Sequence, residues 1–133
     1  MLRALHDLCQ RIQKLNGLDV HFHTDQPYTF TKQQDLAIYR IIQELLNNTL
    51  KHAQASTITL HFEQHPTALH IRYSDNGQGM NPTEIQALST GLGFKSIETR
   101  VNLINGTLEV TSEKGQGIQV TITLPSREIL DIT

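Results

Sequence analysis

The sequence predicts an α+β fold, a two-layer α/β sandwich in which a mixed β-sheet is covered on one face by helices. Two observations support this prediction. Segments with helical spacing and segments with alternating polarity follow one another in the order helix, strand, helix, two strands, helix, two strands. The 133 residues suffice for one domain with a real core, and no repeat or low-complexity linker divides them.

The chain begins with a predicted helix and strand. Residues 2–15 carry apolar side chains three and four positions apart, which predicts a helix that ends near Gly17. Residues 18–24 then place an apolar side chain at every second position, so they predict a strand with one buried face. Pro27 closes this strand.

A long helix is predicted next. Thr31 and Gln34 have the spacing of a capping box and mark its start. Its apolar residues recur at the spacing of three and four that one helix face requires, which lets that face cover a sheet. These residues are Ile38, Ile42, Leu45, Leu46 and Ala53.

Two neighbouring strands follow the long helix. Residues 56–64 and 68–74 both alternate in polarity, and the short turn between them contains a proline. The second strand therefore delivers Asp75 to an edge of the sheet. A helical pattern resumes at residues 94–104.

The long helix also carries a polar stripe. Glu44, Asn47, Asn48 and Lys51 share one helix face, so a carboxylate, two carboxamides and an ammonium group converge. Solvent-exposed charge is the ordinary explanation for such a stripe. Asparagine is a mediocre helix former, however, and two in succession suggest a role beyond helix formation. An amide oxygen is also a suitable ligand for Mg²⁺.

Three pairs of glycines, each separated by one residue, punctuate the second half of the chain: Gly77 and Gly79, Gly91 and Gly93, and Gly115 and Gly117. The first pair follows Asp75 and, taken alone, predicts an ordinary turn. The second precedes the helix at residues 94–104, whose free N–H groups could face an anion. The third lies between alternating runs at residues 107–112 and 119–124, which favours a hairpin turn.

Composition excludes several classes of function. A net charge of −2 with balanced acids and bases gives no polybasic patch, so we expect no nucleic-acid partner. Cys9 is the only cysteine, which excludes an internal disulfide and a cysteine-based zinc site and favours a reducing cytoplasm. The sequence has neither an apolar run of about 18 residues nor the apolar region of a signal peptide.

The order of the motifs carries a resemblance. Glu-x-x-x-Asn-x-x-Lys-His begins at Glu44, Asp-x-Gly-x-Gly-Met at Asp75, Gly-Leu-Gly at Gly91, and Gly-x-Gly at Gly115 before a strand that ends in Leu-Pro. Together they resemble the ATP-binding catalytic domain of bacterial sensor histidine kinases, in the GHKL ATPase superfamily with type II topoisomerases and the MutL repair proteins. Within the kinases, the amino-acid sequence of residues 38–48 and 93–101 is most similar to the subfamily that pairs with helix-turn-helix response regulators.

The resemblance implies a role for each motif residue. Glu44 would orient the acceptor or accept its proton in phosphoryl transfer, Asn48 would bind Mg²⁺, and Asp75 would accept the adenine amino hydrogen. The other implied ATP-binding residues are Lys51 and His52 toward the phosphates, Gly77 and Gly79 in the loop over the base, Met80 in its apolar wall, and Gly91, Leu92 and Gly93 at the end of a short ATP lid.

Two features depart from the family pattern. The position after Gly117 is often threonine in these kinases but is Ile118 here, which puts a polar contact near the base in doubt. The segment between Met80 and Gly91 is short and lacks the phenylalanine-bearing box of kinases with longer lids. A short lid fits the subfamily and leaves less chain to hold the nucleotide.

The resemblance also predicts domains and partners. Residues 1–16 would be the tail of a dimerisation and phosphoacceptor hairpin helix or a linker, residues 17–126 the ATPase domain, and residues 127–133 a C-terminal tail. Besides Mg·ATP, the partners would be a histidine-bearing dimerisation domain, expected in the same full-length protein, and a response regulator. The chain itself would not span a membrane, and would be cytoplasmic or the cytoplasmic end of a membrane-anchored sensor.

Apart from His52, the histidines are not expected to be functional. His6, followed by an acid, resembles the phosphoacceptor box, but only about forty residues separate it from Asn48 and Gly17 ends its helix. At about 1.5 Å per residue this helix is too short for a dimerising hairpin. Metal binding by the alternating histidines at positions 21, 23, 61, 65 and 70 is possible in principle, but no acid or cysteine completes a plausible site.

Two other functions remain open. The first is a single-domain anti-sigma-factor serine kinase of the same superfamily, which the length of the chain favours. The second is a non-catalytic ATP sensor whose lid motion changes a protein contact. The wording of residues 39–44 and the N-terminal helix favour the histidine kinase, which in this chain would bind ATP but scarcely phosphorylate itself.

Overall fold

The computed structural model describes residues 1–79 and 93–125. Its helices and strands follow the predicted order closely. In sequence they are α1 (Leu2–Asn16), β1 (Asp19–Thr24), α2 (Lys32–Asn48), the π-helical turn η1 (Thr49–Ala53), β2 (Thr57–Gln64), β3 (Ala68–Asp75), α4 (Gly93–Leu103), β4 (Thr107–Ser112) and β5 (Ile118–Pro125).

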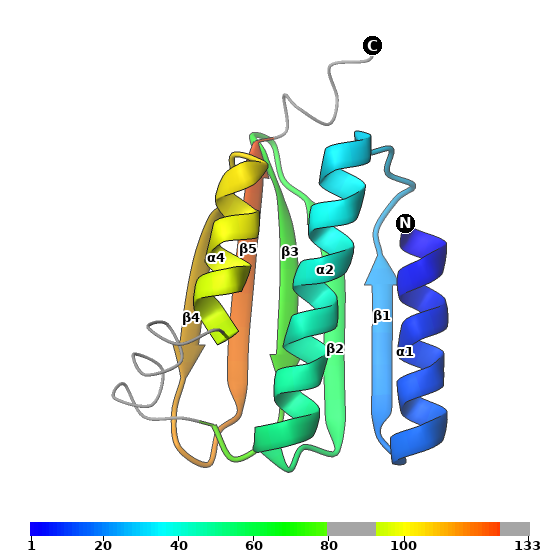
Figure 1. Cartoon of the computed structure of the whole chain (residues 1–133), viewed down its shortest axis with the longest axis vertical. Helices are drawn as coiled ribbons and strands as arrows, with labels where there is room; N and C mark the ends of the chain where they lie inside the picture. Colours follow the sequence, from blue (N-terminus) through cyan, green and yellow to red (C-terminus); the bar gives the residue numbers. More distant parts are fainter. Residues whose placement is uncertain (80–92, 126–133) are drawn as a thin grey trace.

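The strands form one mixed sheet in the order β1-β2-β3-β5-β4. The β1–β2 pair is parallel, whereas β2–β3, β3–β5 and β4–β5 are antiparallel. The described helices lie on the same face of this sheet, with α2 between α1 and α4 (Figure 1). The α+β sandwich with one helical layer is thus confirmed.

Local sequence signals set the ends of the first two helices. Gly17 adopts the left-handed conformation after α1, and its N–H donates to the carbonyl of Gln13. At the start of α2 the predicted capping box is present. The Thr31 hydroxyl accepts from the Gln34 N–H, while the Gln34 side chain accepts from the Thr31 N–H.

One apolar core joins the sheet to the helical layer. Strands β2, β3 and β5 bury alternate residues, and α2 buries the face predicted from its spacing. Helix α1 belongs to the same core, since its Leu5, Leu8, Cys9 and Ile12 side chains are buried. Residues 1–16 therefore fold onto the sheet, and their continuation into a hairpin stays a prediction.

The end of the long helix differs from the prediction. After Asn48 the chain continues into η1, a π-helical turn that ends at Gln54 in the left-handed conformation. Such turns are rare and occur often at functional sites. Helical spacing alone gave no signal for it.

The histidines lie mainly on the sheet face opposite the helices. His21 and His23 are exposed, whereas His61, His65 and His70 are partly buried. The histidines on β2 and in the turn after it share an acid: the Glu63 carboxylate lies 2.9 Å from His65 and 3.7 Å from His61. In residues 1–79 and 93–125 we find no group of three or more histidine, cysteine or acidic side chains that could hold a metal.

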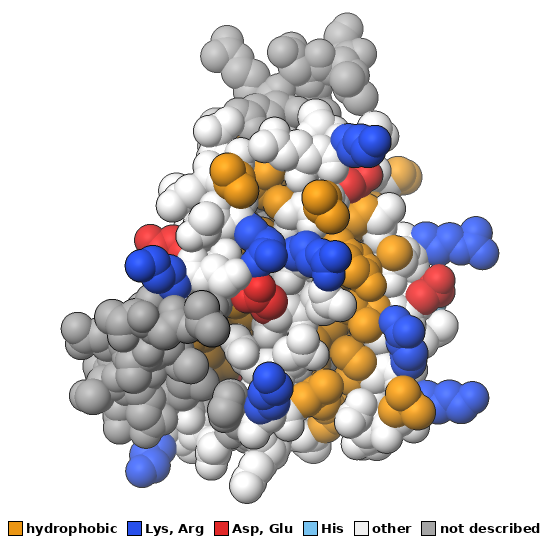
Figure 2. All heavy atoms as spheres, in the orientation of Figure 1, with side chains coloured by type: hydrophobic (Ala, Val, Ile, Leu, Met, Phe, Trp, Pro, Cys, Tyr) orange, Lys and Arg blue, Asp and Glu red, His pale blue; other side chains and the backbone are white. Residues whose placement is uncertain are grey.

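On the face over the helices, the described basic side chains are scattered. Figure 2 shows lysine and arginine side chains spread over this face, with an interrupted band of hydrophobic side chains between them. Among the described helices, none is both long and apolar enough to cross a membrane.

Candidate functional site

The polar stripe and the Asp75 turn meet at one end of the fold. Helix α2 ends at Asn48, and the next residue, Thr49, is buried against β3. The Thr49 hydroxyl donates to Asp75 Oδ2 over 2.9 Å. This hydrogen bond joins two motifs that are 26 positions apart in the sequence.

Asp75 is a buried acid that accepts a hydrogen bond at each carboxylate oxygen. Its side chain is largely buried, with 7% of the residue exposed. Oδ1 accepts from the backbone N–H of Gly77 at 2.9 Å, which closes a tight turn, and Oδ2 accepts from Thr49. Both carboxylate oxygens are thus held before any ligand binds, while each keeps a lone pair for a further donor.

A buried tyrosine extends this network. The Tyr73 hydroxyl lies 2.6 Å from the Thr49 hydroxyl and donates to the Leu45 carbonyl over 3.2 Å. Burial raises the pKa of Tyr73 well above its ordinary value, and the nearby Asp75 charge adds to this effect. The phenol therefore stays neutral at physiological pH and can donate a hydrogen bond.

The turn after β3 is clamped to the start of β2. The Asn76 side-chain oxygen accepts from the backbone N–H groups of Ser56 and Thr57, at 2.9 Å each, and its amide donates to the Ser56 hydroxyl at 2.8 Å. The position of Asp75 is therefore fixed relative to the segment that leaves η1.

The third glycine pair forms the β4–β5 turn, as predicted, and also packs on the Asp75 turn. Gly117 has φ +81°, and a Cβ atom there would lie 2.0 Å from the Asp75 carbonyl oxygen. Gly79 has φ +67°, and a Cβ atom there would lie 2.1 Å from the Glu113 carbonyl oxygen. Only glycine permits both the conformation and the close approach at these positions.

Glu44 faces α4 in this structure. Its Oε1 accepts from the Ser96 hydroxyl at 2.9 Å and from the Arg100 guanidinium at 2.6 Å. The ion pair is partly exposed, with 33% of the Arg100 side chain and 29% of the Glu44 side chain accessible. The predicted catalytic carboxylate is therefore tied to the helix that follows the lid.

The other stripe residues vary in exposure. Asn47 and Lys51 are exposed, whereas Asn48 is half-buried. The Asn48 side-chain nitrogen is buried and has no hydrogen-bond partner among the described residues. The nitrogen itself does not bind Mg²⁺. The side chain fits a Mg²⁺ site when the amide is turned so that its oxygen faces the ion, which needs few protein oxygens when phosphates supply others.

Several predicted residues cannot be placed. Met80, Gly91 and Leu92 lie outside the described residues, as does the side chain of His52. Gly93 is the first residue of α4.

Ile118 stands beside Asp75 on β5, at the position where these kinases often have threonine. It pairs with Asp75 in the β3–β5 register and is buried, with 8% exposed. The Ile118 side chain is aliphatic and has no group that can form a hydrogen bond at this part of the site. The hydroxyl beside Asp75 comes instead from the helix, at Thr49.

The sequence interpretation missed several contributors. Thr49 lies four residues after the buried Leu45, so helical spacing could have placed its hydroxyl on the covered face. Tyr73 lies two residues before Asp75 on the buried side of β3, but nothing local indicated its partners. Ser96 and Arg100 showed no signal, because their contact with Glu44 spans more than fifty positions.

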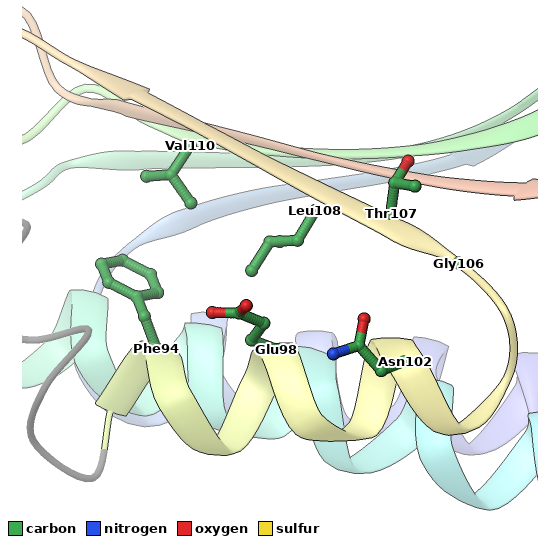
Figure 3. A pocket seen from close by; sticks show the side chains of 7 residues that line it. All are labelled: Phe94, Glu98, Asn102, Gly106, Thr107, Leu108 and Val110. Carbon is green, nitrogen blue, oxygen red and sulfur yellow. The ribbon is translucent and has the colours of Figure 1, made fainter.

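A separate cavity lies between α4 and β4. Its volume is about 340 Å³, and Figure 3 shows side chains of Phe94 and Glu98 facing those of Leu108 and Val110 across it. Asn102, Gly106 and Thr107 complete its lining. None of these residues belongs to the Asp75 site.

The sequence is similar to a known family and to named proteins. The family model described as histidine kinase-, DNA gyrase B- and HSP90-like ATPase matches residues 33–128. The histidine-protein kinase/phosphatase DegS of Brevibacillus brevis is 31% identical over 127 residues, which are 94% of this chain and 32% of DegS. The sensor histidine kinase LiaS of Bacillus subtilis is 30% identical over 122 residues, 92% of this chain and 33% of LiaS.

A third relative and a solved structure extend the comparison. The oxygen sensor histidine kinase NreB of Staphylococcus carnosus is 28% identical, with 92% of this chain and 35% of NreB covered. The chain thus spans about a third of the length of these curated relatives. The histidine kinase domain of the Erythrobacter litoralis EL346 blue-light activated kinase shares the fold, with a TM-score of 0.79, 21% identity, and 93% of this chain and 60% of that chain covered.

Proposed function

The chain belongs to the histidine kinase-, DNA gyrase B- and HSP90-like ATPase family, and from this membership we propose that it is the catalytic domain of a two-component sensor histidine kinase. It binds Mg·ATP and donates the γ-phosphate to a histidine on a separate dimerisation domain. The phosphoryl group then passes to a response regulator. The named relatives are histidine kinases, which favours this function over the anti-sigma-factor serine kinase and the ATP sensor.

The observation that carries the proposal is the contact between Thr49 and Asp75. Through it the end of α2, with its unpaired Asn48 amide, meets the acid turn that follows β3. An acceptor for an adenine amino group and a candidate Mg²⁺ ligand are therefore held at one end of the sheet.

The nucleotide lies between these two groups in the proposed complex. Asp75 accepts a hydrogen bond from the adenine amino group, Asn48 contributes an oxygen to Mg²⁺, and Lys51 and His52 approach the phosphates. Bound Mg²⁺ supplies positive charge that offsets repulsion among the phosphates. The loop at Gly77, Gly79 and Met80 covers the base, and Gly91, Leu92 and Gly93 lie at the phosphate end of the lid.

Glu44 acts on the acceptor histidine in this proposal. Both of its contacts fall on Oε1, so among the described residues Oε2 has no partner. Arg100 and Ser96 hold the carboxylate in one orientation, which favours a positioned group over a mobile one. Oε2 is then the atom that orients the incoming imidazole or takes its proton.

Incubation of the chain with γ-labelled ATP and Mg²⁺ tests whether the phosphoacceptor histidine lies outside this chain. We expect nucleotide binding but scarcely any label in the protein, because the acceptor histidine lies on another domain. His6 is exposed on α1 and serves as the control position. Substantial acid-labile labelling that disappears in His6→Gln would contradict the proposal, and acid-stable labelling of an added protein substrate would favour the serine kinase.

A further inference from the structure

A chain of buried hydroxyl groups leads from α2 to the Asp75 carboxylate. It begins at the Leu45 carbonyl, passes through the hydroxyl groups of Tyr73 and Thr49, and ends at Asp75 Oδ2. All three side-chain members are buried, with 1%, 5% and 7% of the residue exposed for Tyr73, Thr49 and Asp75. Water therefore does not compete with these hydrogen bonds.

The direction of the hydroxyl protons follows from counting donors. Tyr73 and Thr49 have one hydroxyl proton each, but they make three close contacts. An ionised carboxylate can only accept, so the Thr49 proton points to Asp75. The 2.6 Å contact between the two hydroxyls is then satisfied when the Tyr73 proton points to Thr49, with the more distant Leu45 carbonyl sharing it.

We propose that Thr49, supported by Tyr73, is the positioning residue that makes Asp75 selective for adenine. The inference rests on the proposed function of Asp75 as the base acceptor. Thr49 fixes Oδ2 and uses its only proton there, so neither the carboxylate nor this hydroxyl offers a donor to the base. Adenine offers an amino group at this position, whereas a base with a carbonyl at C6 offers an acceptor and is repelled.

The neighbouring strand cannot supply the same hydrogen bond. Ile118 pairs with Asp75 across β3 and β5 and has no polar side-chain atom. On the other side, the Gly77 N–H already serves Oδ1. Thr49 is therefore the one side-chain donor to the Asp75 carboxylate among the described residues.

The network offers variants that keep the fold. In Thr49→Val the Tyr73 hydroxyl can still donate to the Leu45 carbonyl, so no buried donor is left without an acceptor. In Tyr73→Phe the Thr49 hydroxyl still donates to Asp75, but its own donor is lost. Thr49→Ser restores the hydroxyl. Thr59→Val makes the same chemical change on β2, on the sheet face opposite the helices, and is the matched control.

Titration of each protein with Mg·ATP and with Mg·ITP, whose base has a carbonyl in place of the amino group, tests the proposal. We expect Thr49→Val to weaken ATP binding by about three- to tenfold, and Tyr73→Phe by less, with ITP binding unchanged. The preference for ATP should therefore fall, and Thr49→Ser should restore it. Thr59→Val should behave as wild type.

Two outcomes would overturn the inference in distinguishable ways. If Thr49→Val leaves the ratio of ATP to ITP affinity unchanged while Asp75→Asn lowers it, Thr49 does not position Asp75 and the proposed function stands. If the wild-type chain itself does not bind Mg·ATP, the proposed function fails and this inference fails with it.

Discussion

Asp75 is held by donors from two distant parts of the chain. Gly77 lies two residues away in the turn, whereas Thr49 reaches the carboxylate from the end of the long helix. A carboxylate that is fixed in advance loses less orientational freedom when a ligand binds. In the proposed complex this preorganisation favours selective binding of the base at Asp75.

The reactivity of Cys9 tests whether α1 packs on the sheet. The thiol is buried on α1 with 3% of the residue exposed, and burial raises its pKa to about 11. At pH 8 the reactive thiolate is then about a thousandth of the total, against roughly a quarter for an ordinary exposed cysteine.

We therefore expect Cys9 to react with a thiol reagent such as DTNB at least about a hundredfold more slowly in the native protein than in urea. The measured rate reports on Cys9 alone, because the sequence contains no other cysteine. Equal rates in the two states would show that α1 does not pack on the sheet.

Among the elements, the β4–β5 turn and the Asp75 turn depend on each other. Gly115 and Gly117 both have positive φ, +84° and +81°, but their surroundings differ. A Cβ atom on Gly115 would meet nothing within 4 Å, whereas one on Gly117 would overlap the Asp75 carbonyl. Substitution of Gly115 therefore measures the free-energy cost of the left-handed conformation alone. Substitution of Gly117 adds the cost of steric overlap with the Asp75 turn.

Gly115→Ala should lower the free energy of unfolding by about 1 kcal/mol, the usual cost of a left-handed alanine. Gly117→Ala should lower it by at least about 2 kcal/mol more, because the backbone of the Asp75 turn must move. Urea unfolding followed by circular dichroism measures both. Equal losses in the two variants would contradict the close packing of these turns.

Helices α2 and α4 are linked by an ion pair. The pair joins Glu44 on α2 to Arg100 on α4. Because both side chains are about one-third exposed, the pair adds only about 1 kcal/mol or less to stability. Its larger effect is to set the orientation of the Glu44 carboxylate.

For the molecule as a whole, periodicity predicted the fold well. The capping box at Thr31, the glycine end of α1 and the alternation of the strands are local signals, and each appears in the structure near its predicted position. The positions of Asp75 and Asn48 followed from motifs. Their roles in ATP binding remain predictions.

What the sequence could not predict depends on contacts between distant segments. The Thr49–Tyr73 contact joins η1 to β3 across 24 positions, and no local pattern encodes which hydroxyl faces which. The π-helical turn after α2 had no signal in the helical spacing either. Such long-range pairings appear only when the helices and strands are placed together.

Calorimetric titration of the chain with Mg·ATP and Mg·ITP, in the wild type and in Asp75→Asn, tests the central claim most directly. A carboxylate has about four acceptor positions and an amide oxygen two, so the side chain of the Asp75→Asn variant cannot accept from Thr49, Gly77 and the base together. We predict that the wild type binds ATP and prefers it to ITP, and that Asp75→Asn weakens ATP binding by about tenfold or more. Asp7→Asn, on the exposed side of α1, should change nothing. Wild-type protein without ATP affinity, or Asp75→Asn protein with unchanged affinity, would contradict the account.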